Sequence, residues 1–332
     1  IETVGANDAR VDYLDNAKGA LKLEPSRTNL ITQSEAFDNS YWTKSGASVV
    51  GGFASPSADS PLGAYKLVST SSNGQIQAAI GTGVVGSNYV GSIYVKRIKG
   101  NGLIYIRNIN GSTIPINTTN EWQRFEASAT ASGTTLRVGL NIETIGDEVM
   151  IFGGQLEAGS YATSIIKTEG TVQTRLADSC SQTPPDGVIG QTEGTMFFEI
   201  DFKNTSGVSG AWSISNASTA NRITMNTTNL SSTQFTLSVA QNYNSGSTKL
   251  ASSNVTFSDK HKVAIKYSGT TLKLFVDGQL SDSVSTDGFG NYTNFYVGGN
   301  QNGVGGDARK FIQANLYNTA LSDSELAALT QV

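Results

Sequence analysis

The sequence predicts an all-β protein of two consecutive antiparallel β-sandwich (jelly-roll) domains, followed by a short C-terminal helix. Two observations carry this prediction. Short runs of alternating apolar and polar residues, broken by Gly, Asn, Ser and Thr, recur along most of the chain, and helical periodicity is nearly absent. The length of 332 residues agrees with about two domains.

The expected strands follow one another along the chain. In the first half, alternation is clearest over residues 89–97, 102–108 and 135–143. In the second half, it is clearest over residues 195–202, 262–267 and 271–275. Such alternation places apolar side chains on one face of a sheet and polar side chains on the other, as in a sandwich with one buried face per sheet.

Turn and capping signals punctuate the second half. Asp277 and Gly278 directly follow an apolar strand pattern, which predicts a tight hairpin turn. Ser322 and Glu325 have the spacing of a capping box, and the leucines and alanines that follow predict a helix of at most two turns.

The clearest break in the patterning lies between residues 179 and 193. Pro184 and Pro185 cannot continue a central strand, and the Asp–Gly pair after them favours a turn. We therefore expect an N-terminal arm at residues 1–30, a first sandwich at 31–178, a linker at 179–193 and a second sandwich at 194–332.

Composition excludes several classes of function. Charged residues make up only 15% of the chain, and the net charge of -4 offers nothing that would attract nucleic acid or anionic lipid. A lone cysteine, Cys180, excludes an intrachain disulfide, and a lone histidine, His261, excludes sites that need two imidazoles. No apolar run approaches the roughly 18 residues of a membrane helix.

Three stretches resemble known families. Residues 20–49 contain EPSRTNL before an F…W opening, and residues 151–178 contain QLEAGSYATS before TRLAD. Both resemble the ends of a jelly-roll module common in bacteriophage tail, fibre and other virion surface proteins, itself similar to xylanase-associated carbohydrate-binding modules. Residues 165–168 read IIKT where relatives tend to have YIPT. Residues 261–330 resemble a laminin-G or concanavalin-like domain.

The resemblance implies a non-catalytic protein on the surface of a phage virion, as part of a fibre, of the tail or of the capsid decoration. Its expected partners are glycans on host or environmental surfaces and other virion proteins, and its expected location is the extracellular virion surface. A homo-oligomer is compatible with it. Cofactors are not expected, apart from a structural calcium that such modules often hold; no dense Asp cluster marks a position for it.

The polar face of the first sandwich is the candidate binding site. Aromatic rings can cover the apolar face of a sugar, while Arg, Asn and Glu side chains hydrogen-bond its hydroxyls. If the two tyrosines pair in register on adjacent strands, they lie within about 5 Å of each other. The alternative is an ordinary solvated face, or one covered by a neighbouring chain. The candidate residues are Tyr94, Lys96, Tyr105, Arg107, Arg137, Asn141 and Glu143.

Two other features resemble catalytic sites. Glu199 and Asp201 share a strand face, as in retaining glycosidases, but Lys203 and Asn204 stand where the acid should be. His261 is the one available imidazole base and has the parity of a core strand. We expect neither to be catalytic. We also expect Trp42, Trp122 and Trp212 to fill cores rather than to stack on a ligand.

Two alternatives to a glycan-binding virion protein remain. The chain could hold the binding modules of a secreted glycan-degrading enzyme whose catalytic part lies elsewhere. It could also be a purely structural decoration protein without a ligand.

Overall fold

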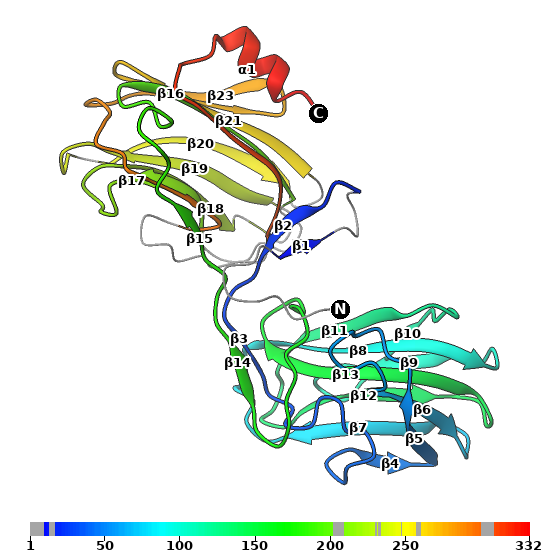
Figure 1. The fold of residues 1–332 in the computed structure, drawn as a ribbon. Helices are drawn as coiled ribbons and strands as arrows, with labels where there is room; N and C mark the ends of the chain where they lie inside the picture. The colour runs from blue at the N-terminus through cyan, green and yellow to red at the C-terminus, as the bar shows by residue number, and fades with distance from the viewer. Residues whose placement is uncertain are drawn as a thin grey trace. The chain divides into compact units, whose positions relative to one another are not determined.

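The computed structural model describes residues 10–12, 17–201, 209–229, 231, 234–246, 248–256, 260–299 and 309–332. In these ranges the chain is built from antiparallel strands, with one short helix near the C-terminus (Figure 1). The prediction of an all-β fold made of sandwiches is confirmed. None of the helices described is long and apolar enough to cross a membrane.

Two compact units divide the described chain. Unit 1 contains residues 27–176, and unit 2 contains residues 10–26 and 177–332. Unit 1 is therefore inserted into the sequence of unit 2. Within the described chain, unit 2 thus contains residues from both sides of unit 1 in the sequence.

Unit 1 is a sandwich of two five-stranded sheets. The first, here called the β9 sheet, contains in spatial order β10 (Thr113–Ile116), β9 (Ile104–Arg107), β12 (Leu136–Ile142), β7 (Gly74–Ile80) and β4 (Thr43–Ser45). The second, here called the β8 sheet, contains β11 (Gln123–Thr130), β8 (Asn88–Lys99), β13 (Glu148–Ala158), β6 (Ala64–Ser69) and β5 (Ala47–Phe53). A separate ladder joins β3 (Arg27–Asn29) to β14 (Gln173–Arg175).

The core of unit 1 lies between its two sheets. Ile104 and Ile106 point into it from β9, and Ile93 and Val95 point into it from β8. Each of these side chains is fully buried, as the alternation of their strands predicts. Trp42 also fills this core, whereas Trp122 is half-buried at the start of β11, so the core assignment was wrong for Trp122.

Unit 2 is a second, larger sandwich. Its seven-stranded sheet contains β1 (Val11–Asp12), β2 (Ala20–Leu23), β25 (Arg309–Tyr317), β16 (Glu193–Asp201), β21 (Lys260–Ser268), β22 (Thr271–Val276) and β23 (Gln279–Ser285). Its six-stranded sheet contains β15 (Cys180–Gln182), β24 (Asn294–Val297), β17 (Ser209–Ser215), β18 (Arg222–Asn229), β19 (Gln234–Asn242) and β20 (Lys249–Thr256). Trp212 is fully buried in the core.

The turn and helix signals of unit 2 are confirmed. Asp277 and Gly278 have φ angles of 49° and 82° and join β22 to β23, as a type I′ hairpin turn requires. The helix α1 (Asp323–Leu329) begins with the predicted capping box of Ser322 and Glu325. It covers part of the outer face of the seven-stranded sheet, where Leu326 packs with three sheet residues: Phe197, Ala264 and Phe275.

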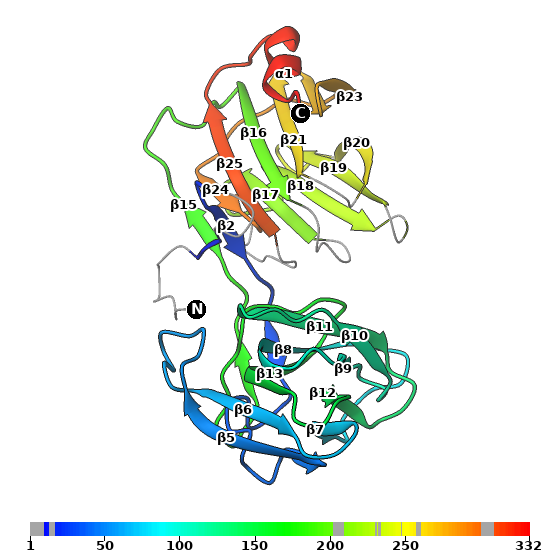
Figure 2. The same ribbon diagram turned by 90° about the vertical axis from the view of Figure 1, so that its right-hand side faces the viewer.

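The strand β2 lies between β1 and β25 in the seven-stranded sheet. It pairs with β25, with Leu21 opposite Phe311, and Leu23 is buried in the core of unit 2 (Figure 2). Residues 20–29, predicted to belong to an arm, thus form strands of both units. Within the predicted linker at 179–193, β15 pairs with β24 and Ile189 enters the core of unit 2.

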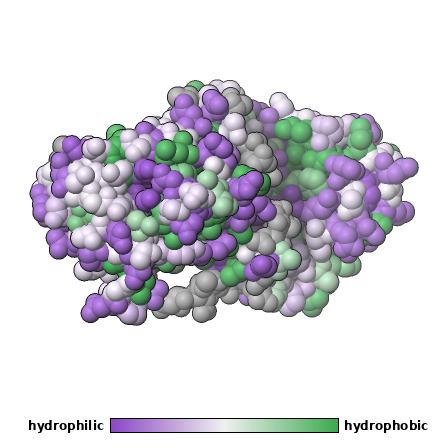
Figure 3. Space-filling model, turned by 90° about the horizontal axis from the view of Figure 1, so that it is seen from above, coloured by the Kyte–Doolittle hydropathy of each residue, from purple (hydrophilic) through white to green (hydrophobic). Residues whose placement is uncertain are grey.

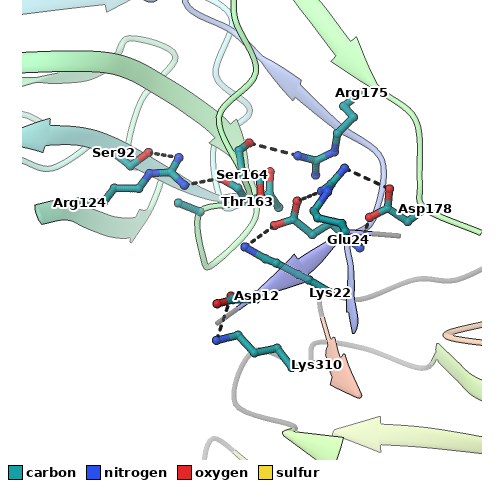
Figure 4. A network of polar contacts seen from close by, with 12 residues as sticks. Asp12, Lys22, Glu24, Ser92, Arg124, Thr163, Ser164, Arg175, Asp178 and Lys310 are labelled. Carbon is teal, nitrogen blue, oxygen red and sulfur yellow. Dashed lines mark hydrogen bonds and ion pairs between the residues drawn. The ribbon is translucent and has the colours of Figure 1, made fainter. Parts of the chain in front are cut away.

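A network of charged groups surrounds the place where the chain passes between the units (Figure 4). The Glu24 carboxylate is buried and pairs with Arg10 and with Lys22. Arg10 also pairs with Asp178, whose carboxylate accepts a hydrogen bond from the Glu24 N–H at 2.8 Å. The Asp178 N–H in turn donates to the Glu24 carbonyl. Residues 24 and 178 are thereby fastened to each other.

The surface agrees with the low charge of the sequence. On the face drawn in Figure 3, hydrophilic residues and residues of intermediate hydropathy are interspersed with small hydrophobic areas. Hydroxyl and amide side chains contribute much of this polarity, since charged residues are scarce.

Candidate functional site

The structure divides the predicted site residues between the two sheets of unit 1. Tyr105 and Arg107 lie on β9, Arg137 and Asn141 lie on β12, and Glu143 follows β12. The other two residues, Tyr94 and Lys96, lie on β8 in the opposite sheet. The outward parity of these strands is as predicted, because the intervening aliphatic side chains are buried.

The expected pairing of Tyr94 with Tyr105 is wrong. The strands β8 and β9 are consecutive in sequence but belong to different sheets, so their outward side chains leave the sandwich on different faces. The chain crosses from one sheet to the other between residues 99 and 104 instead of forming a hairpin. Alternation fixes which side chains point outward, but it does not say which sheet a strand joins.

Tyr94 is held by its neighbours on the β8 sheet. Its ring centroid lies 6.2 Å from that of Phe152, and the Arg124 guanidinium lies 5.4 Å from the ring centre. Arg124 donates to the Ser92 hydroxyl and to the Thr163 carbonyl (Figure 4). Tyr94 is thus one member of a packed cluster that fastens the segment around Thr163 to the sheet.

The outer face of the β9 sheet carries the remaining candidates in cross-strand rows. Tyr105, Asn141 and Gln75 form one row, because Asn141 is directly opposite Tyr105 on one side and Gln75 on the other. Arg107, Gly139 and Gln77 form the next row in the same way. Side chains in such positions lie within contact distance of one another.

Arg107 is the centre of this face. Its Nη2 donates to Gln75 Oε1 at 2.6 Å and to Asn141 Oδ1 at 2.9 Å, and its Nη1 donates to the Gly111 carbonyl at 2.7 Å. All three acceptors are neutral. The positive charge of Arg107 is therefore held in place by amide and carbonyl dipoles, without a carboxylate partner among the described residues.

Gly139 gives Arg107 its path across the sheet. Arg107 on β9 reaches Gln75 on β7, and β12 lies between these two strands. Gly139 is the β12 residue directly opposite Arg107, and it has no side chain to obstruct that path. A Cβ atom at Gly139 would also lie 2.1 Å from the Ile76 carbonyl oxygen, far closer than atoms can approach. The backbone itself thus requires glycine there.

A second guanidinium lies beside the first. The side chain of Arg137 packs against Gly111: a Cβ atom placed on Gly111 would lie 3.4 Å from Arg137 Cδ. The carbonyl of the same Gly111 accepts a hydrogen bond from Arg107. Burial lowers the pKa of Arg107, and the charge of Arg137 lowers it further. Arg107 remains protonated at neutral pH because arginine has so high a starting pKa.

Gln75 and Gln77 belong to this face and were missed as site residues by the sequence reasoning. The signal that could have found them is the strict alternation of residues 74–80, in which both glutamines flank the buried Ile76. Two polar atoms here are buried without a hydrogen-bond partner in the described chain: Gln77 Oε1 and Arg107 Nε. An unsatisfied buried polar atom costs about 1–3 kcal/mol.

The first of the two features that resembled catalytic sites, Glu199 with Asp201, faces lysines on the neighbouring strands. Glu199 lies directly opposite Lys262, and Asp201 lies opposite Lys260 and Lys310 on its two neighbouring strands. Opposite charges in such positions stabilise a sheet. The positions of Lys203 and Asn204 lie outside the described residues.

His261 is buried in unit 2 with both ring nitrogens engaged. Nδ1 lies 2.6 Å from Asp277 Oδ2, and Nε2 lies 3.0 Å from the Thr256 carbonyl oxygen. Asp277 also accepts a hydrogen bond from the Lys262 N–H. The histidine therefore ties the hairpin turn at Asp277 to β21 and to the end of β20.

That the chain folds without a bound metal ion stays a prediction. The described residues contain no group of three or more His, Cys, Asp or Glu side chains that could hold a metal ion. We expect EDTA to leave the far-UV circular dichroism spectrum and the thermal midpoint unchanged, because each unit has its own hydrophobic core. Loss of β-structure on chelation, restored by Ca²⁺, would contradict this expectation.

Comparison with known proteins gives no family assignment. No protein-family model and no curated protein matches the chain. Among solved structures, it is similar to the CBM40 of the Ruminococcus gnavus IT-sialidase bound to α2,3 sialyllactose, at 21% identity and a TM-score of 0.36, covering 42% of this chain and 84% of that chain. It is also similar to a SAP-like pentraxin from Limulus polyphemus, at 14% identity and a TM-score of 0.34, covering 41% and 69%.

A Trypanosoma rangeli sialidase is a further similar structure, at 18% identity and a TM-score of 0.32, covering 42% of this chain and 22% of that chain. The fold of the chain is established by its own strands and sheets. These similarities assign no role to any of its residues.

Proposed function

We propose that the chain is a non-catalytic protein that binds glycans through the outer face of the β9 sheet in unit 1. The observation that carries the proposal is the fixed array of polar side chains on that face, in which Arg107 holds the amide oxygens of Gln75 and Asn141. The NH₂ groups of these two amides have no hydrogen bond among the described residues and are not among the buried polar atoms, so a ligand can accept from them.

A glycan fits the chemistry of this face. Each sugar hydroxyl can both donate and accept a hydrogen bond, so hydroxyls can accept from the NH₂ groups of Gln75 and Asn141. Tyr105 lies in the adjacent row and is half-buried, so part of its ring is open to a ligand. An aromatic ring beside amides and a guanidinium offers an apolar surface and directional hydrogen bonds together.

Binding rather than catalysis is supported by the surroundings of the acidic and imidazole groups. Glu199 and Asp201 lie opposite lysines, and both nitrogens of His261 are engaged in the structure. A general acid or base must be free to exchange a proton with a substrate.

Tyr105→Ala tests the binding face. We expect it to weaken glycan affinity several-fold, because stacking on an aromatic ring contributes on the order of 1 kcal/mol. Tyr94→Ala, at the packed cluster of the opposite sheet, is expected to lower stability and leave the affinity of the folded protein unchanged. A glycan array followed by calorimetric titration of the best ligand measures both. Equal loss of affinity in the two variants would contradict the assignment of the site to the β9 sheet.

The setting that we propose is the surface of a bacteriophage particle, where the chain would attach to host or environmental glycans. It is supported by the resemblance of residues 20–49 and 151–178 to virion modules. The second candidate is a purely structural decoration protein. A complete absence of glycan binding, together with binding to purified virion components, would favour that candidate.

A further inference from the structure

We propose that the outer face of the β9 sheet selects glycans that carry a carboxylate or a sulfate group. This inference rests on the proposed glycan-binding function and names the class of glycan. It follows from the direction in which the amide groups of the face are held and from the position of Arg137.

Arg107 orients two amides so that their oxygens face inward. Gln75 Oε1 and Asn141 Oδ1 both accept hydrogen bonds from Arg107 Nη2. The NH₂ groups of the same amides therefore point away from Arg107, and neither has a hydrogen bond in the described structure. An amide that offers only its NH₂ group is a donor without an accessible acceptor.

Arg137 adds a charged donor to the same area. Its side chain is half-buried beside Gly111, and among the described residues it makes no side-chain hydrogen bond or ion pair. Its guanidinium is close enough to lower the pKa of Arg107. Two arginines held near each other without a carboxylate repel one another, and an anion placed between them or beside them relieves that repulsion.

The face is therefore rich in donors and positively charged around Gly111. Anionic oxygens accept hydrogen bonds about twice as strong as those of neutral acceptors. Glu143 directly follows the C-terminal end of β12, whereas Arg137 lies near its N-terminal end. The Glu143 carboxylate is exposed and has no ion pair among the described residues. It would repel an anion at that end, so the acidic group of a ligand should lie on the Arg137 side.

Tyr105 distinguishes a glycan from a simple anion. Its half-buried side chain, in the row next to Arg107, offers an apolar surface that an inorganic anion cannot use. A sugar that carries an acidic group uses both features: its apolar face packs on Tyr105 while its acidic group accepts from Arg137 and from the amides.

Matched pairs of glycans test the inference on the full chain. The pairs are 3′-sialyllactose with its methyl ester, oligogalacturonate with its methyl ester, and dextran sulfate with dextran. The first two pairs differ in a carboxylate and the third differs in a sulfate, so the pairs identify which acidic group is preferred. We expect at least one acidic member to bind about tenfold or more tightly than its partner, and salt to weaken that member selectively.

Two variants and a control make the test specific to this face. Arg137→Gln is expected to reduce the preference to less than about threefold. Gln75→Glu keeps the size of the side chain and places a carboxylate against Arg107, so it should also abolish the preference. Lys99→Gln removes the same charge from an exposed lysine on β8 and should leave the preference unchanged.

The outcomes separate this inference from the proposed function. Binding of neutral and acidic members with equal affinity would overturn the inference and leave the glycan-binding proposal standing. An acidic preference that persists in both variants would also overturn it. Binding to no member of any pair, nor to any glycan of a broad array, would overturn both proposals.

Discussion

A fragment of residues 177–332 is expected to be less stable than the intact unit 2 by at least about 3 kcal/mol. It lacks β1 and β2; β2 supplies the buried Leu23 and Ala20 and pairs with β25, which becomes an edge strand in the fragment. Burying one leucine side chain contributes about 1.5–3 kcal/mol, and the loss of paired backbone groups adds to this. The exposed edge of β25 should also promote association between copies.

The matched control restores the missing strand without restoring unit 1. Residues 10–26 are joined to residues 177–332 by a short Gly/Ser linker, which is feasible because Arg27 and Arg175 are directly opposite each other in an antiparallel ladder. Trp212 is the single tryptophan in either fragment, so its fluorescence reports urea unfolding of unit 2 alone. Equal unfolding midpoints for the two fragments would show that β2 is dispensable.

Asn29→Ala is expected to destabilise unit 1 by about 3–5 kcal/mol. Asn29 is fully buried and makes four hydrogen bonds: Nδ2 donates to the Gly154 and Ile166 carbonyls, and Oδ1 accepts from the Ile31 and Leu156 N–H groups. Its removal leaves these four backbone groups buried without that partner, at about 1 kcal/mol each or more.

Hydrogen exchange of the full chain measures this effect within one molecule. Amide protection in the core strands of unit 1 should fall by about a hundredfold or more, since about 1.4 kcal/mol corresponds to a factor of ten. Protection in unit 2 is the internal reference and should not change. Thr28→Ala, which removes an exposed hydroxyl contact with Thr174, should have little effect. If it destabilises unit 1 as much as Asn29→Ala does, the four buried hydrogen bonds are not the cause.

The strand faces could be predicted from the sequence because burial has a strict period of two. The fully buried Ile104 and Ile106 and the outward Tyr105 and Arg107 follow directly from that period. The hairpin at Asp277 and the capping box at Ser322 could be predicted for a similar reason, since each depends on a few neighbouring residues. Strand faces, tight turns and helix caps can therefore be predicted from short stretches of sequence.

The pairing of strands could not be predicted in the same way. That β9 pairs with β12 and β10, and not with β8, depends on contacts between residues far apart in sequence. The contribution of Gln75 to the site has the same origin, because only the neighbouring β12 brings it to Asn141. The placement of residues 20–23 in unit 2 likewise depends on β25, about 290 positions later.

The double crossing between the units has a mechanical consequence. Unit 1 is joined to unit 2 by two chain segments, near residues 24–27 and 175–178, which are fastened to each other by the Glu24–Asp178 hydrogen bonds and by the ladder of Arg27 with Arg175. A pulling force between the two units would therefore be shared by two covalent segments of the chain. Cleavage of one segment alone would leave the units covalently joined through the other.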